Sequence, residues 1–203
     1  MPSKLLNWSG RTAVVLASGP SLRDFIREGT LPDTVRTITT NSSIFAYPLA
    51  DVAFGLDFMW WKMHVQAVRR DSQASCWTTD RTTAERFGLH FVRGVNESGL
   101  HPTRVNSGGN SGHAAINLAA LFGAKRILLL GFDMALGEEG EKHWHPRHPN
   151  PCVQAQVFPD WLLKFDSLAK GCEKAGIEVI NCSTRTALTV FPRMSLERAL
   201  CPT

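Results

Sequence analysis

Short apolar runs alternate along the chain with segments of helical spacing. The apolar runs are rich in β-branched and large side chains, which is typical of buried strands. They cover residues 11–18, 34–41, 51–57, 74–80, 89–95, 125–133 and 177–183. Helices are predicted at 19–29, 58–70, 111–124, 157–176 and 195–200. Apolar strands separated by helices indicate an α/β, Rossmann-like fold with a mostly parallel sheet and helices on both faces.

The chain of 203 residues fits a single domain, 1–203, with one nucleotide-binding-like sheet. Its longest stretch without a predicted element is 134–155, which follows the strand at 125–133. Loops of this length inside a compact domain are usually functional, so we expect the active-site loop here.

Composition narrows the class of protein. Hydrophobic residues make up 43% and charged residues 20%, as in folded globular proteins. No apolar run approaches the roughly 18 residues of a membrane span, the N-terminus lacks a signal sequence, and the five scattered cysteines contain no C-x-x-C pair. We therefore expect a cytoplasmic protein with reduced thiols. The net charge of +4 favours phosphate-bearing small molecules, while the dispersed basic residues predict no nucleic-acid surface.

Small polar residues follow nearly every predicted strand. In open parallel sheets, ligands bind at the carboxyl ends of the strands, so these residues are the first candidates for a site. After the first strand, Gly19, Pro20 and Ser21 lead into a helix, where free N–H groups and the helix dipole favour an anion. The same residues equally suit a simple capped turn with proline in the first helical position.

The segment "NSGGNSG" is the strongest single signal for a ligand. It offers backbone donors together with amide and hydroxyl groups at the start of an alanine-rich helix. A plain helix cap needs one such side chain, whereas this loop has four within six residues, which favours nucleotide binding over an ordinary flexible loop. The candidates are Asn106, Ser107, Gly108, Gly109, Asn110 and Ser111.

The segment "HWHPRH" places His143, His145 and His148 within the long loop. Three roles are open: a metal site completed by Asp133, a general acid or base, or incidental surface histidines. Trp144, between the first two histidines, is the aromatic residue that we expect to contact a ligand.

Two aspartates and one aromatic segment can each be interpreted in more than one way. Asp57 and Asp133 end predicted strands, where each could hold a hydroxyl, a ribose or a metal, or cap the next helix. The Trp- and Met-rich segment 58–63 is expected in the core or in a subunit interface of a homo-oligomer rather than in a ligand site.

These segments, in this order, resemble a superfamily that contains bacterial lipooligosaccharide-type sialyltransferases and MptE-like 6-hydroxymethylpterin diphosphokinases. The resemblance spans roughly residues 11–192 and rests on "VVLASGPSL", "TTNSS", "NSGGNSGHAAINLAALFGAKRILLLGFDM", "KHWHPRHP" and "GIEVINCSTRTALTVFP". The compact chain is similar to stand-alone members encoded by phages and prophages.

The resemblance implies roles for individual residues. Gly19, Pro20 and Ser21 would line the nucleotide phosphates, and Asn41, followed by Ser42, would contact the nucleotide or the transferred group. The nucleotide would be cradled by Ser107 and Gly108, or equally by Asn110, Ser111 and Gly112. The catalytic base would be His148 or His145. One departure is that the sialyltransferases use tyrosines to stabilise the leaving phosphate, whereas this chain has a single tyrosine, Tyr47, on another segment.

The expected function is therefore nucleotide-dependent group transfer, with a glycosyl group from a nucleotide-activated sugar as the leading candidate and a histidine as general base. One alternative is an ATP-dependent diphosphokinase that uses Mg²⁺ held by Asp57 or Asp133. Another is a binding or assembly protein that keeps the fold without the chemistry. No resident cofactor is expected under the leading hypothesis, in which the nucleotide is a substrate.

Overall fold

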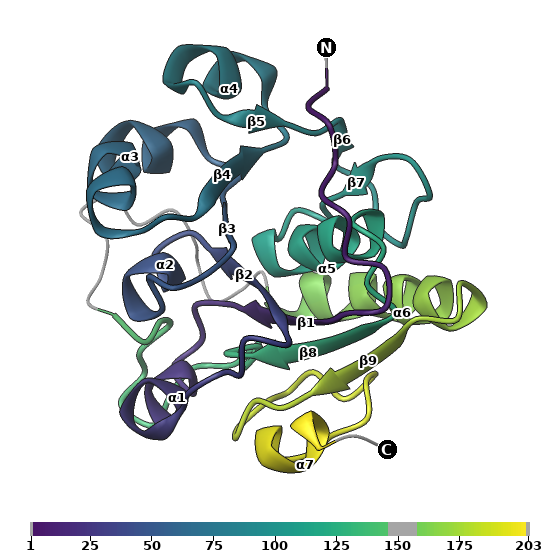
Figure 1. Cartoon of the computed structure of the whole chain (residues 1–203). Coiled ribbons are helices and arrows are strands. Elements are labelled where there is room, and N and C mark those ends of the chain that lie inside the picture. The colour runs from purple at the N-terminus through teal and green to yellow at the C-terminus, as the bar shows by residue number, and fades with distance from the viewer. Residues whose placement is uncertain (1, 146–157, 202–203) are drawn as a thin grey trace.

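The computed structural model describes residues 2–145 and 158–201, and within them the predicted α/β, Rossmann-like fold is confirmed (Figure 1). The main sheet has seven strands, all parallel, in the order β5-β4-β3-β2-β1-β8-β9. The strands are β1 (Thr12–Leu16), β2 (Arg36–Thr40), β3 (Val52–Phe54), β4 (Ser75–Thr78), β5 (His90–Phe91), β8 (Arg126–Leu130) and β9 (Glu178–Asn181).

The order of the strands creates a topological switch point between β1 and β8. The chain leaves β1 toward β2 and continues to β5 on one side, then returns to β8 on the other side. Leu16 at the end of β1 pairs with Thr39 of β2 and with Leu130 of β8, so the three strands end almost level. Crevices at such a point are the usual ligand sites of open parallel sheets.

Helices cover both faces of the sheet. One face carries α5 (Ser111–Leu121) and α6 (Phe158–Lys174), which pack with the side chains of the largest core cluster (Figure 1). The side chains of the remaining helices belong to two clusters on the opposite face. These helices are α1 (Leu22–Glu28), α2 (Ser43–Ala46), α3 (Phe58–Asp71), α4 (Arg81–Phe87) and α7 (Leu196–Leu200).

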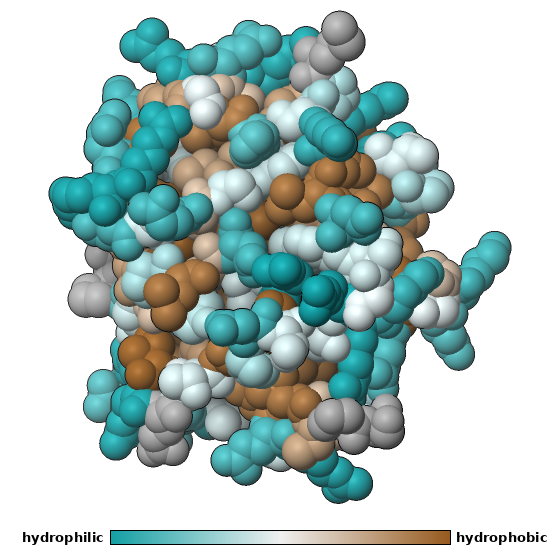
Figure 2. Space-filling view, viewed as in Figure 1, coloured by the Kyte–Doolittle hydropathy of each residue, from teal (hydrophilic) through white to brown (hydrophobic). Residues whose placement is uncertain are grey.

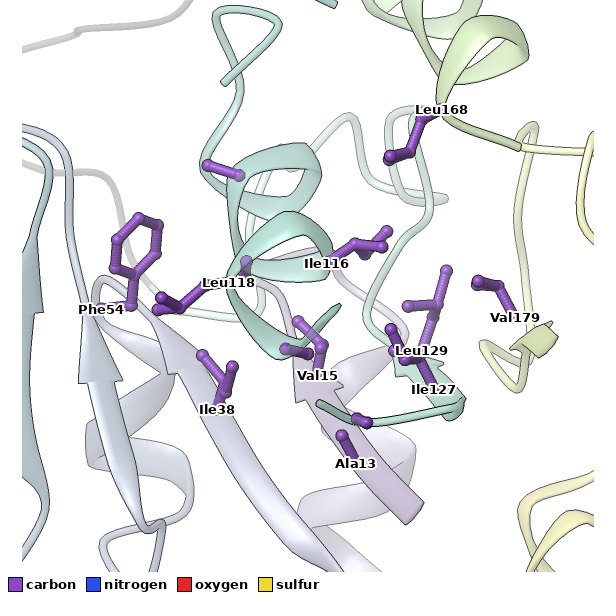
Figure 3. Close-up of a cluster of buried hydrophobic side chains, with 14 of the residues drawn as sticks. Ala13, Val15, Ile38, Phe54, Ile116, Leu118, Ile127, Leu129, Leu168 and Val179 are labelled. Carbon is purple, nitrogen blue, oxygen red and sulfur yellow. The ribbon is translucent and has the colours of Figure 1, made fainter. Parts of the chain in front are cut away.

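Successive residues of the central strands point to opposite faces, which explains their unbroken apolar pattern. Val15 of β1 belongs to the cluster under α5, whereas Val14 and Leu16 belong to the cluster under α1. Ile116 and Leu118 of α5 lie over this sheet face, beside the strand side chains (Figure 3). Small residues along α5 allow the helix to approach the strands closely, and Ala114, Ala115 and Ala119 are completely buried.

One predicted strand is wrong in its extent, and several short elements were not predicted. The apolar run 89–95 contains β5 and a separate strand, β6 (Gly94–Val95), which pairs with β7 (Val105–Asn106) in a small second sheet. The ladder with β4 ends where Val92 N–H donates to Thr78 O. Gly94 then passes so close to Thr79 that a Cβ at position 94 would lie 2.5 Å from the threonine Cβ. The sequence analysis also named no helix at α2 or α4.

The face of the molecule seen in Figure 2 is largely polar, with smaller apolar areas among the hydrophilic side chains. In segment 58–63, Trp60 and Trp61 are buried in the core, while Met59 and Met63 on the outer side of α3 are exposed. This division confirms the core interpretation for the tryptophans, and an oligomer interface at the methionines stays a prediction. No described helix combines the length and apolar character that crossing a membrane requires.

Candidate functional site at the carboxyl edge of the sheet

Asp133 and Ser21 join the two sides of the switch point. Asp133 lies three residues past β8 and is buried, and its Oδ2 accepts the backbone N–H of Ser21 at 2.8 Å. Its Oδ1 accepts the Ser21 hydroxyl at 2.6 Å. A Cβ at Gly19 would lie only 2.2 Å from the same Oδ1, so the turn after β1 needs glycine for this close approach. The donors of Ser21 are therefore used by a carboxylate of the protein itself.

The electrostatics of Asp133 fit a structural bridge. Burial raises the pKa of Asp133 above its usual value, while the two hydrogen bonds from Ser21 and the positive charge of Arg185 oppose this rise. Both carboxylate oxygens face Ser21, and only 5% of the residue is exposed. Little of this carboxylate is left for a ligand or a metal.

Asp57 has the capping role that was one of its two predicted alternatives. Its Oδ1 accepts the N–H of Trp60 at 2.7 Å and so satisfies a donor in the first turn of α3. The residue is exposed at the end of β3. Ser42 is also engaged, because its buried hydroxyl accepts the indole N–H of Trp60 at 3.2 Å.

The glycine-rich loop before α5 is closed by hydrogen bonds of its own. Gly108 and Gly109 have φ values of 55° and 72°, which favour glycine, and Asn110 N–H donates to Ser107 O across them. The N–H groups of residues 107, 108 and 109 donate to Val95 O, Glu97 O and Ser107 Oγ, respectively. Asn106 is buried, and its amide bonds to Arg104 and Ser98. These residues build the loop, and their backbone N–H groups from 107 to 110 are already occupied.

Open donors begin at the next two residues, in the first turn of α5. Asn110 caps this helix by accepting His113 N–H at 3.0 Å. Within the described residues, the N–H groups of Ser111 and Gly112 have no acceptor. The positive end of the helix dipole therefore lies at the carboxyl edge with donors available to an anion.

His113 anchors this end of α5 from inside. The side chain is fully buried, with Nδ1 3.0 Å from Asn106 O, while Gly99 N–H donates to Nε2 at 3.3 Å. This arrangement requires the neutral ring with its proton on Nδ1. Burial lowers the pKa of His113 to about 4. His113 therefore packs locally and holds the N-terminus of α5 in place.

Asn41 lies between the switch point and the N-terminus of α5. It follows β2 directly and has a φ of +48°, in the left-handed region that a non-glycine residue enters at a cost. Its Nδ2 donates to Ser111 Oγ at 3.3 Å. Its Oδ1 is buried and has no hydrogen-bond partner in the described part of the chain. A strained residue with an unpaired buried acceptor, at this position in the fold, marks the candidate site.

The loop after Asp133 crosses the end of β1. Trp144 N–H donates to Ser18 O at 3.1 Å, and its side chain packs partly into the cluster that covers α1. Its indole Nε1 is buried without a partner among the described residues. The rings of His143 and His145 stack at 5.2 Å with an interplanar angle of 3°. His148 lies outside the described residues, so the choice between the histidines stays a prediction.

Hydrogen bonds from Ser18 connect the two halves of this edge. Its hydroxyl lies 3.4 Å from Thr40 O, immediately before Asn41, and 3.1 Å from Ser43 Oγ. The Gly19 turn, Asp133 and Trp144 are therefore on the same edge as Asn41, Ser111 and the glycine-rich loop. Among residues 2–145 and 158–201, no three His, Cys, Asp or Glu side chains group as a metal site.

Two arginines that the sequence analysis did not select also reach this edge. Arg23 of α1 and Arg185 after β9 both contact the loop that follows Asp133. The only sequence signal for either residue is that it comes within a few positions of a strand's polar end. Topology, rather than local pattern, brings them together.

A depression of about 370 Å³ lies at the opposite, amino edge of the sheet, between Trp8, Arg36, Asp51 and Ser75. Arg36 and Asp51 pair at 3.0 Å, and Asp51 also accepts Thr37 N–H, so the charged groups there bind the starts of β2 and β3 together. Asn41 Oδ1 and Trp144 Nε1, which are buried without a partner among the described residues, are at the carboxyl edge instead, which makes that edge the better candidate.

No protein-family model matches this chain, and none of the curated proteins matches its sequence. Inference about function therefore rests on the geometry and chemistry of the carboxyl edge.

Proposed function

We propose that this chain binds a nucleotide across the carboxyl ends of β1 and β2 and transfers a group from it to a hydroxyl acceptor. The leading candidate is a glycosyl group from a nucleotide-activated sugar. Asn41 carries the proposal, because it combines a left-handed backbone with a buried, unpaired Oδ1 beside the open N-terminus of α5. Each feature costs about 1–3 kcal/mol, and a ligand that donates to Oδ1 would repay part of that cost.

The groups at this edge that lack a hydrogen-bond partner among the described residues match the parts of a nucleotide. The N–H groups of Ser111 and Gly112 suit a phosphate at the positive end of α5. Asn41 Oδ1 accepts a hydrogen bond from a base amino group or a ribose hydroxyl, and Trp144 Nε1 donates one to a phosphate or carbonyl oxygen. The N–H groups of the neighbouring glycine-rich loop stabilise that loop, so the phosphate would be bound by the first residues of α5.

In the proposed reaction, a histidine of the loop removes the proton from the acceptor hydroxyl. The acceptor oxygen forms a bond to the sugar's anomeric carbon, the bond from that carbon to the nucleotide's phosphate oxygen breaks, and the phosphate leaves with the electron pair. Base assistance of this kind contributes about 10²–10⁴-fold to the rate. The candidates are His143, His145 and His148. The N–H donors of α5 and the indole of Trp144 would stabilise the departing phosphate, the role that tyrosines have in the sialyltransferases, since the single tyrosine of this chain, Tyr47, is on another segment.

The first experiment measures whether nucleotides raise the melting temperature. CMP, CDP, UDP, GDP and ATP are each added with and without Mg²⁺; a ligand at 100 times its dissociation constant stabilises the fold by about 2.7 kcal/mol. Stabilisation by one pyrimidine or guanine nucleotide supports the proposal. Stabilisation by ATP that requires Mg²⁺ would favour a diphosphokinase, and the lack of any shift would favour a binding or assembly protein.

The second experiment assigns the base with the corresponding sugar nucleotide, by following release of the free nucleotide. His143→Gln, His145→Gln and His148→Gln are compared with His101→Gln, a histidine outside the proposed site. The proposal expects a loss of about 100-fold or more in one loop variant. Full turnover in all three single variants and in the triple variant would contradict a histidine base.

A further inference from the structure

We propose that Arg23 and Arg185 bind a second phosphate of the donor, and that Glu141 and Glu138 occupy these arginines in the ligand-free molecule. The inference rests on the proposed nucleotide site and narrows its substrate class to nucleoside diphosphates and their derivatives. In this arrangement, one phosphate lies at the N-terminus of α5 and the next lies between the two guanidinium groups.

The two arginines come from segments that follow the two neighbours of β8 in the sheet, β1 and β9. Arg23 lies in the first turn of α1, and its Nε donates to Trp144 O at 2.8 Å while its Nη1 donates to Glu141 Oε1 at 3.1 Å. Arg185 follows β9, and its Nη1 donates to Glu138 Oε1 at 2.6 Å. Both contacts are made to the loop that carries His143 and His145.

The two arginines contact one turn of the loop, in which Gly137 N–H donates to Glu141 O at 2.8 Å, and their charges act on the same carboxylate. Backbone hydrogen bonds in the turn, together with the charges of Arg23 and Arg185, hold the pKa of Glu141 below its usual value. Arg185 also acts on the buried carboxylate of Asp133 at the end of β8. An anion placed here therefore interacts with both arginines and lies next to the end of the β1–β8 pair.

A phosphate can replace the glutamate carboxylates as the partner of each arginine. Each pair uses one guanidinium nitrogen for the carboxylate, and the remaining Nη2 groups have no acceptor in the described chain. Both arginine side chains are 46% exposed, while Glu138 is 85% and Glu141 21% exposed, so a ligand can reach both guanidinium groups from solvent. Exposed pairs of this kind contribute about 0–1 kcal/mol, whereas a phosphate can engage an arginine through two parallel hydrogen bonds.

Displacement would connect donor binding to the position of the catalytic loop. Glu138 and Glu141 lie in the same loop as His143 and His145, so a phosphate that takes over the arginines also removes two of the loop's anchors. The backbone contact from Trp144 to Ser18 would remain as a pivot between the loop and β1. Removing the two carboxylates should therefore strengthen binding of a diphosphate.

The test measures the dissociation constants of inorganic pyrophosphate, CMP and CDP by calorimetry, at fixed ionic strength. For Arg185→Gln and Arg23→Gln/Arg185→Gln we expect pyrophosphate and CDP to bind about tenfold or more weakly, because charge-assisted hydrogen bonds are lost. CMP affinity should change by less than about threefold. Glu138→Gln/Glu141→Gln should bind pyrophosphate more tightly than the unmodified chain. Arg86→Gln, on the exposed surface of α4, is the matched control and should change nothing.

In the described part of the chain, the side chain of Arg185 bonds to the exposed Glu138 and to no core residue, so the Arg185→Gln variant keeps the test valid if the double variant folds poorly. If Arg185→Gln and the double arginine variant bind pyrophosphate as tightly as the unmodified chain, the arginine site is wrong. It is also wrong if neither the unmodified chain nor the glutamate variant binds pyrophosphate at millimolar concentration. If the arginine variants bind CDP as tightly as the unmodified chain, this inference is wrong and the proposed nucleotide function is unaffected. If pyrophosphate binding depends on the arginines but CDP binds no more tightly than pyrophosphate, the proposed nucleotide function is wrong and the arginine site is unaffected.

Discussion

Ser21 holds the carboxylate of Asp133 with both its backbone N–H and its hydroxyl, at 2.8 and 2.6 Å. The two residues are 112 positions apart in the chain and join the turn after β1 to the end of β8. Because ligands of this class of fold bind between these strands, the pair fixes the floor of the candidate site. It also explains why the turn before Ser21 contains a glycine.

Replacing Gly19 with alanine should destabilise the protein strongly. The added methyl group would lie 2.2 Å from Asp133 Oδ1 and 2.5 Å from Gly131 O, so either the bridge or the backbone must move. Overpacking of this kind costs about 1–3 kcal/mol, and disruption of the buried bridge adds to it. Urea denaturation measures the change in the free energy of unfolding.

Gly140→Ala is the control for that substitution. Gly140 has a φ of +76° but no atom within 4 Å of an added Cβ, so only backbone strain of about 1–2 kcal/mol is expected. A Gly19→Ala protein no less stable than Gly140→Ala would show that the close approach of the turn to Asp133 is not essential.

Removing the Ser21 hydroxyl should destabilise the fold more at neutral than at acidic pH. Ser21→Ala leaves Oδ1 of a buried carboxylate without its donor, at a cost of about 1–3 kcal/mol. Folding already raises the pKa of Asp133, so the contribution of this group is present at low pH and is lost as pH rises through the folded pKa. The substitution raises this pKa further. Unfolding free energies at about pH 4 and pH 7 test the difference, and equal losses at both values would contradict it.

Because His113 is buried in its neutral form, we expect the free energy of unfolding to fall as the pH is lowered. Folding lowers its pKa from 6.5 to about 4, so the stabilising neutral form is fully present above pH 6.5 and is lost as the pH falls toward 4. The difference corresponds to about 3 kcal/mol between the two protonation states. Protonation of Nε2 would direct a second donor against Gly99 N–H. Urea denaturation between pH 7 and pH 4 should show this slope.

Comparison of two variants isolates the histidine responsible. His113→Gln should be less stable at pH 7 but should lose less further stability on acidification than the unmodified chain. His90→Gln, an exposed histidine on β5, should keep the original slope. An unchanged acid slope in His113→Gln would assign the acid sensitivity to other groups.

Much of the fold follows from the sequence because burial on both faces leaves a pattern that needs no tertiary information. The unbroken run "ILLL" predicts β8 since neither side of that strand meets water. The run at 89–95 misleads for the same reason, because an apolar sequence does not record that Gly94 turns away from β4 to pair with β7. Short elements such as α2 pack against other elements, here β2 and α3, and the local sequence does not record those contacts.

The candidate site is less predictable, because pattern identifies polar residues but not their partners. The loop "NSGG" looks like a set of free donors, yet the N–H groups from Ser107 to Asn110 donate to acceptors in the loop itself and in residues 95–97. The left-handed backbone and unpaired oxygen of Asn41 appear only once distant strands and loops are brought together. The same is true of the contacts that Arg23 and Arg185 make with one loop. The roles that the resemblance implies for these residues stay predictions.

Calorimetric titration of Asn41→Gly with the nucleotide that stabilises the unmodified chain tests the central claim most directly. Glycine tolerates the left-handed backbone and removes the unpaired oxygen, so the melting temperature should stay within a few degrees of the original or rise. Nucleotide affinity should nevertheless fall about tenfold or more, since the ligand loses a hydrogen bond to a buried acceptor. A stable Asn41→Gly protein that binds the nucleotide as tightly as the unmodified chain would contradict the account.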